Sequence, residues 1–180
     1  MATKMPSEDL AQEVYAYYEN HKRLADRNLS IRQWWEIQDV IRNEPLSSLI
    51  DDRMFEIIAN AEKTNSVNQL GTDLEDWNIV YVVAKCYDDA RKYPAVGRIA
   101  IAKMIGLAKT YNEWIEFDHH GVLVLVEAYP EFTELALENL KNCPLSLEEW
   151  QRFLESYSDS DESNKFQQLA KQKIRELTLN

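Results

Sequence analysis

Glycine, cysteine and long apolar runs are scarce in this chain. Its 180 residues include four glycines and two cysteines, and its one strand-like run, over 122–126, lies within a longer helical pattern. We therefore expect almost no β-sheet. Cys86 and Cys143 lie far apart in the sequence and no secretory signal precedes them, so we expect no disulfide framework. No apolar stretch approaches the roughly twenty residues of a membrane span. These absences predict a cytoplasmic protein with no membrane segment.

Basic residues are in deficit as well. The chain has 20 lysines and arginines against 31 aspartates and glutamates, a net charge of −11. Counted by segment, the net charge is −1 over 1–28, −3 over 29–71, −5 over 72–143 and −2 over 144–180, so no single acidic block exists. Binding to nucleic acid or to an anionic membrane requires clustered lysine and arginine. We predict neither, and an acidic binding surface would favour a basic protein or peptide partner.

What the chain does have is a tryptophan that returns behind the same helix-start pattern. The pattern covers 30–34, 73–77, 110–114 and 146–150, and it ends each time on a tryptophan. The successive spacings of these tryptophans are 43, 37 and 36 residues. A period in the mid-thirties is typical of stacked helical hairpins.

Each pattern has the chemistry of a capping box. Its first residue, Ser30, Asp73, Thr110 or Ser146, can accept a hydrogen bond from a backbone N–H at the start of a helix. The residue three positions later, Gln33, Asp76, Glu113 or Glu149, can reach back to the N–H of the first. Asp76 departs from the preferred type, because its side chain is one methylene shorter than that of glutamate. We still predict a helix there.

These signals predict paired helices along the chain. The expected helices cover 7–27, 30–43, 47–62, 73–91, 94–109, 111–127, 130–142, 146–157 and 163–177, with a loop over 63–71 and a turn over 158–163. Gly121 is a weak point of the helix over 111–127, so a kink or an early break there is the alternative.

The resulting fold class is all-α. We predict a right-handed α-solenoid of about four antiparallel helical hairpins, with repeats at about 30–62, 73–109, 110–143 and 146–178. Residues 1–28 are expected to form an N-terminal capping helix, and residues 29–180 the helical-hairpin repeat domain.

Candidate chemistry is sparse. Glu116 and His120 would lie four residues apart on one face of a helix, where they are weak candidates for binding a metal. Catalytic zinc requires three protein ligands, so we expect a polar helix face and predict no cofactor. No phosphate-binding glycine loop and no nucleophile elbow are present in the sequence. A metal-dependent enzyme is therefore the weakest of the functional alternatives.

The five tryptophans fall into two groups. Trp34, Trp77, Trp114 and Trp150 recur once per repeat and are expected to be buried anchors between helices. Trp35 lies about 100° around the helix from Trp34, so the two side chains cannot face the same contact. Trp35 either packs beneath the N-terminal helix or is partly exposed, and an exposed tryptophan is a common interface residue. It is our one candidate binding residue.

The units resemble tetratricopeptide-like and HEAT-like helical-hairpin repeats in period, over about 30–180. They lack the tetratricopeptide signature residues at the usual offsets, and they look like degenerate short repeats found in bacterial proteins. The resemblance implies a non-enzymatic protein–protein interaction module and transfers no catalytic residue. The alternative is an acidic inhibitor or immunity-type protein that blocks a basic, nucleic-acid-binding site. The sequence indicates no oligomeric state.

Overall fold

The computed structural model describes Ala16 and residues 29–40, 46–85, 93–117, 120–157 and 164–179. Every regular element in these ranges is a helix, and none is a strand. The strand-like run over 122–126 is itself helical. The prediction of an all-α fold is therefore confirmed for this part of the chain, in which no helix has the length and apolar character needed to cross a membrane.

Most predicted helices have observed counterparts, and the expected ends of the helices over 30–43 and 73–91 lie outside the described residues. The elements are α2 (Ile31–Val40), α3 (Leu46–Lys63), η1 (Val67–Gln69), α4 (Leu74–Lys85), α5 (Pro94–Leu107), α6 (Tyr111–Ile115), α7 (Val122–Ala128), η3 (Pro130–Phe132), α8 (Thr133–Lys141), α9 (Leu147–Glu155) and α10 (Lys165–Thr178). The predicted loop over 63–71 contains the short helix η1. The expected helix over 7–27 lies outside the described residues except for Ala16, which is helical, and the turn over 158–163 lies outside them entirely.

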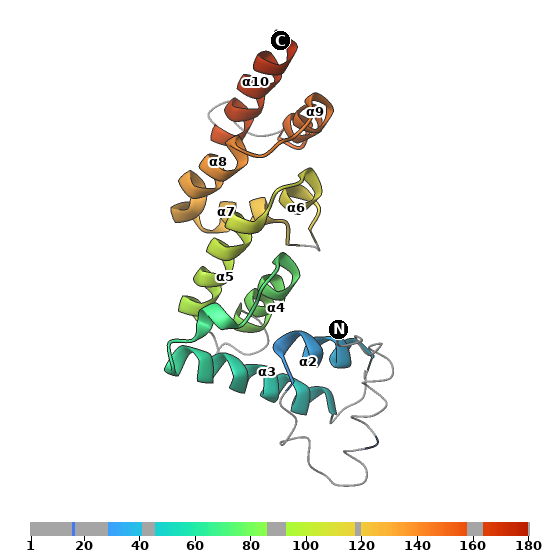
Figure 1. Cartoon of the computed structure of the whole chain (residues 1–180), viewed down its shortest axis with the longest axis vertical. Helices are drawn as coiled ribbons and strands as arrows, with labels where there is room; N and C mark the ends of the chain where they lie inside the picture. Colours follow the sequence, from blue (N-terminus) through green and yellow to red (C-terminus); the bar gives the residue numbers. More distant parts are fainter. Residues whose placement is uncertain are drawn as a thin grey trace. The chain divides into compact units, whose positions relative to one another are not determined.

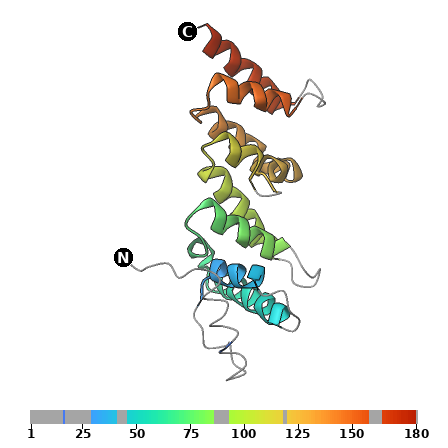
Figure 2. The ribbon, with the colours of Figure 1, turned by 90° about the vertical axis from the view of Figure 1, so that its right-hand side faces the viewer.

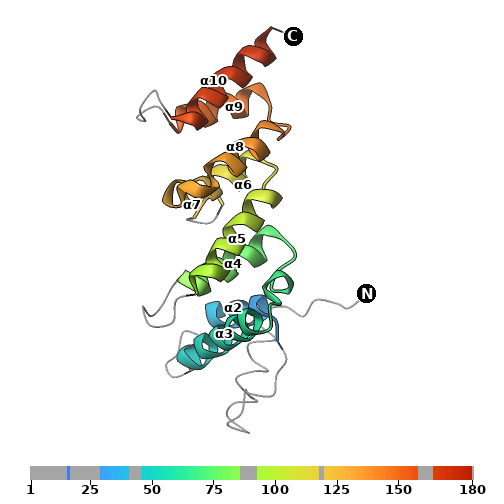
Figure 3. The same cartoon turned by 90° about the vertical axis from the view of Figure 1, so that its left-hand side faces the viewer.

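The chain divides into two compact units, Met1–Ala100 and Ile101–Asn180. In the first unit α2 lies beside α3, as Figure 1 shows, and both helices pack against α4. In the second unit α9 packs along α10 (Figure 2), and α7 packs against α8 (Figure 3). Each unit thus has its own buried contacts between helices.

The recurring tryptophans are the largest buried side chains. Trp34, Trp77, Trp114 and Trp150 each expose 2% or less of their surface. The indole N–H of Trp114 also donates to the buried thiol of Cys143, with 3.3 Å between Nε1 and Sγ. Because burial removes a large apolar area from water, these side chains anchor the cores of both units, as their spacing predicted.

Three of the four helix N-termini are capped as the sequence predicted. At α6 the hydroxyl of Thr110 accepts from the backbone N–H of Glu113, whose carboxylate accepts from the N–H of Thr110. Ser146 and Glu149 make the same reciprocal pair at α9. At α2, Gln33 accepts from the N–H of Ser30 over 2.9 Å and donates its own N–H to the Ser30 hydroxyl.

The single helix expected over 111–127 is wrong, and the alternative break is what the structure has. Helix α6 ends at Ile115, and α7 begins at Val122 after Gly121. The backbone at Gly121 folds so closely over the end of α6 that an added Cβ would lie 2.5 Å from the Ile115 carbonyl oxygen. Only glycine fits this approach without a shift of the backbone, which is the physical reason for the break.

Candidate functional site

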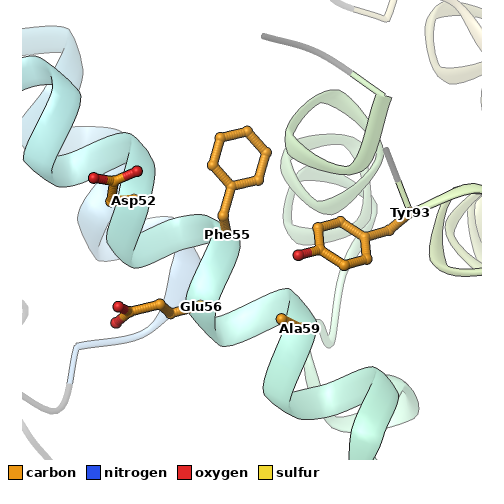
Figure 4. A pocket seen from close by; sticks show the side chains of 5 residues that line it. All are labelled: Asp52, Phe55, Glu56, Ala59 and Tyr93. Atoms are coloured by element: carbon orange, nitrogen blue, oxygen red, sulfur yellow. The ribbon is translucent and has the colours of Figure 1, made fainter. Parts of the chain in front are cut away.

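The first unit has a hollow of about 400 Å³ on one side of α3. Asp52, Phe55, Glu56 and Ala59 line it from α3, and Tyr93 lines it from the residue before α5. Figure 4 shows the Tyr93 ring with its hydroxyl directed toward α3, beside Phe55 and Ala59. The carboxylates of Asp52 and Glu56 lie on the other side of Phe55 from Tyr93. The hollow thus combines two aromatic rings with two carboxylates.

Helical periodicity explains why these α3 side chains meet. Residues three and four apart share one face of a helix, so Asp52 and Glu56 follow each other along the hollow. The opposite face of α3 is apolar and fully buried at Ile50, Met54 and Ile58. Burial of that face fixes the rotation of α3 and holds both carboxylates outward, where both residues are exposed.

Tyr93 is positioned by the backbone around it. Its N–H donates to the carbonyl of Ala84 near the end of α4, with a distance of 3.0 Å. Pro94 follows at the first position of α5, where proline loses no helical hydrogen bond. Tyr93 is half-buried, whereas Phe55 exposes only 5% of its surface. Phe55 therefore forms the closed base of the hollow and Tyr93 an open wall.

The described side chains that line the hollow include two carboxylates. Glu56 accepts from Arg53 on the same helix at 2.5 Å, an ion pair whose side chains are 59% and 26% exposed. Asp52 also interacts with neighbouring groups. Among the described residues that line the hollow, two carry a carboxylate and none carries a positive charge. This described lining attracts a cation through the carboxylates and through the ring faces, and it contains no nucleophile paired with a base.

A second charged cluster in the first unit surrounds Arg32 on α2. Its guanidinium donates to both carboxylate oxygens of Asp73 at 3.0 Å and to Glu75, and its Nε lies 3.1 Å from an oxygen of Asp76. Burial alone would raise the pKa of Asp73, but the N–H of Asp76 and the Arg32 guanidinium outweigh it and lower that pKa. These carboxylates already hold a cation, so the cluster fastens α2 to the start of α4.

A larger hollow, of about 580 Å³, lies between α8 and α10 in the second unit. Glu134 and Glu138 line it together with Lys141 and Lys165, and Glu134 is paired with Lys165. Among the described residues that line this hollow, the two signs of charge balance and none is aromatic. This described lining therefore has no preference for either charge, and the hollow is the weaker candidate.

The residues singled out from the sequence do not come together in one site. Trp35 is half-buried on α2 and does not line either hollow. Glu116 terminates α6, and His120 lies between α6 and α7, so the assumed helical spacing between them is wrong. The neighbouring Asp118 and His119 lie outside the described residues. Within the described part of the chain, no three His, Cys, Asp or Glu side chains cluster as metal ligands would.

The lining of the α3 hollow was missed at the level of sequence. Asp52 and Glu56 counted only toward the net charge, and Tyr93 only as the residue before a helix start. A signal was present, since acidic residues four apart on an amphipathic helix form an acidic stripe. The position of Tyr93 beside α3 has no local signature in the sequence.

No family model, no curated protein and no solved structure matches this chain.

Proposed function

We propose that this protein is a non-enzymatic interaction module whose α3 hollow receives a basic side chain of a protein or peptide partner. The observation that carries the proposal is the pairing of two rings, Phe55 and Tyr93, with two carboxylates, Asp52 and Glu56, around about 400 Å³ of open space. The proposal includes a setting in the cytoplasm and a repeat architecture, a right-handed α-solenoid. The recurring capped helix starts and buried tryptophans support that architecture.

Arginine is the ligand that suits this hollow best. Its planar guanidinium stacks on an aromatic face and donates two parallel hydrogen bonds to a carboxylate. In this arrangement the guanidinium takes the place of Arg53 on Glu56, and the rest of the partner segment crosses α3 past Phe55 toward Tyr93. Exposed ion pairs contribute about 0–1 kcal/mol, so this exchange costs little. Lysine provides the charge without the planar stacking, and we expect it to bind more weakly.

A titration with short blocked peptides tests the proposal. One peptide has a central arginine, and the comparison peptides have norleucine or glutamate at that position. We expect the wild-type protein to bind the arginine peptide and neither of the comparison peptides. Its affinity for the arginine peptide should fall as added salt screens the charges. The double change Asp52→Asn with Glu56→Gln should weaken binding about tenfold, as expected for losing a charged hydrogen bond.

The matched control is Asp39→Asn with Glu62→Gln. Both residues are exposed in the first unit, on α2 and α3, and neither lines the hollow. This control removes the same amount of charge, so it separates a local contact from a long-range field. Equal losses of affinity in the two double variants would reject the hollow as the binding site. They would instead favour the alternative of an acidic inhibitor that acts through its overall charge.

A further inference from the structure

Helix α10 has a charge opposite to that of the rest of the molecule. It contains four basic residues, Lys165, Lys171, Lys173 and Arg175, and one acidic residue, Glu176, in a chain whose net charge is −11. The preceding acidic residues hide this helix when charge is averaged over 144–180. The basic character of α10 therefore becomes visible only when the charge is counted helix by helix.

The exposed face of α10 combines this charge with an apolar residue. Lys171, Arg175 and Leu179 follow one another at four-residue spacing and border a shallow hollow of about 370 Å³. Leu179 is 86% exposed. The Lys171 ammonium donates to the side chain of Gln167 at 3.1 Å, while Arg175 has no ion-pair partner among the described residues. Glu176 also lines this hollow, and its carboxylate is paired with Lys173 at 3.6 Å. The face therefore suits a surface that offers carboxylates and an apolar patch.

The α3 hollow offers those groups at the same spacing. Asp52 and Glu56 are four residues apart, as are Lys171 and Arg175, so each pair spans about 6 Å along its helix. If two such helices lie parallel, Lys171 meets Asp52 and Arg175 meets Glu56. Leu179 then lies one turn further, against Ala59 and Tyr93. The two faces are therefore complementary in charge, in spacing and in the position of the apolar contact.

We propose that a second copy of this chain is the partner, and that its α10 docks into the α3 hollow. This inference rests on the proposed function and deepens it, because Arg175 is then the basic side chain that the hollow receives. The two faces differ, so the contact joins unlike surfaces of the two copies, and it gives either a closed ring or a growing chain according to the rotation between neighbouring copies. In both cases the protein associates beyond the monomer as its concentration rises. Repulsion between copies of net charge −11 keeps each contact weak.

Variants with reversed charges test this contact. Their self-association is measured by sedimentation of the full chain over a wide range of concentration at fixed physiological salt. The tail variant is Lys171→Glu with Arg175→Glu, and the head variant is Asp52→Lys with Glu56→Lys. Each variant alone has like charges on both faces and should remain monomeric at concentrations where the wild type associates. An equimolar mixture of the two should associate again, because each variant then has a partner of opposite charge. The variant with all four changes should also regain self-association.

The control for charge reversal is Lys109→Glu with Arg152→Glu, two exposed residues away from both faces. It should associate as the wild type does. The inference is overturned if the wild type stays monomeric while it still binds the arginine peptide, a result that leaves the proposed function intact. A wild type that stays monomeric and also fails to bind the arginine peptide would contradict both this inference and the proposed function. Self-association that persists in either the head variant or the tail variant also overturns the inference. The inference is likewise overturned if the protein never self-associates but its α10 binds a polyglutamate peptide or anionic vesicles.

Discussion

The starts of α4 and α9 share one sequence pattern but are closed in different ways. At α9, Glu149 accepts from the N–H of Ser146 at 2.7 Å, so the two residues of the cap satisfy each other. At α4, Asp76 instead accepts from the N–H of Thr72 at 2.8 Å and pairs with Arg32 of α2. The side chain that is one methylene shorter does not make the reciprocal bond and takes other partners. The same sequence pattern thus forms a local cap in the second unit and a contact between two helices in the first unit.

This difference changes what each helix start depends on. Helices α6 and α9 have both halves of the capping box within a few residues, so their starts are stable without any distant side chain. The start of α4 keeps one half, a 2.9 Å bond from the N–H of Asp76 to Asp73. Arg32, 41 residues away from Asp73, does not replace the missing half, but it donates to the Asp73 carboxylate and so binds this helix start to α2. The first unit therefore couples the formation of α4 to the packing of α2.

The largest expected effect concerns the tryptophans that follow these starts. Trp77 and Trp150 are buried to the same degree, so Trp77→Ala and Trp150→Ala should each lower the free energy of unfolding by roughly 3–5 kcal/mol, through the cavity that is left. Chemical denaturation followed by circular dichroism measures both. Similar losses would show that the two units differ in their helix starts and not in their anchors. A near-neutral change at either position would contradict the anchoring role.

Removal of the distant partner should have the next largest effect. Arg32→Ala leaves Asp73, Glu75 and Asp76 close together without their cation, and we expect it to cost about 1–2 kcal/mol of stability, since part of the cluster is exposed. Hydrogen exchange should show loss of protection at the start of α4 and none at α9. The matched change in the second unit is Arg152→Ala, whose partner Glu148 is an exposed neighbour on the same helix. Equal effects of the two changes would remove the distinction between the units.

Local caps should contribute less. Thr110→Ala and Ser146→Ala each remove the hydroxyl that accepts from the third helical residue, and each should cost about 1 kcal/mol. The matched conservative changes are Thr110→Ser and Ser146→Thr, which keep the hydroxyl and should stay close to the parent. Thermal unfolding of the four variants gives the comparison. A loss in the conservative variants as large as in the alanine variants would point to packing in place of capping.

Local patterns alone predicted most of the helices, because caps and apolar periodicity act within a few residues. The same reasoning failed between the end of α6 at Ile115 and the start of α7 at Val122, because the close approach of Gly121 to the Ile115 carbonyl depends on tertiary packing. It also missed the α3 hollow. The N–H of Tyr93, one of the residues that line it, donates to the carbonyl of Ala84, a contact that no local pattern shows. The basic helix α10 was hidden for a simpler reason, the averaging of charge over a boundary between helices.

Two neighbouring tryptophans on α2 allow a test of the one binding residue proposed from the sequence. Trp34 is buried and Trp35 is half-buried. Trp34→Ala should destabilise the first unit as the other anchors do. Trp35→Ala should leave the melting temperature close to that of the parent and weaken partner binding by more than about 1 kcal/mol. Because Trp35 does not line the α3 hollow, the short arginine peptide should bind unchanged, and sedimentation of the full chain measures the second effect. Unfolding by Trp35→Ala without a separate loss of binding would assign that side chain to the core.

The smallest expected effect is on the pH dependence of stability, which should differ between the local caps of α6 and α9 and the start of α4. Hydrogen bonds from Ser146 lower the pKa of Glu149 below its ordinary value of 4.5. At Glu113, burial alone would raise the pKa, but hydrogen bonds from the backbone of Lys109 and Thr110 outweigh it and also lower that value below 4.5. A carboxyl whose pKa is lower in the folded state stabilises the fold above its unfolded pKa. That stability is then lost as the pH falls through the folded pKa.

Glutamine should keep these caps and abolish their titration, as Gln33 already caps α2 without a charge. We therefore expect the double variant Glu113→Gln with Glu149→Gln to lose less stability than the parent between about pH 5 and pH 3. Urea unfolding across this range measures the slope of free energy against pH. The start of α4 should keep its acid sensitivity in that variant, because the pKa of Asp73 is also lowered, from 3.8, and Arg32 remains in place. An unchanged slope in the double variant would mean that the two glutamates contribute nothing to acid unfolding and that the cluster around Arg32 dominates it.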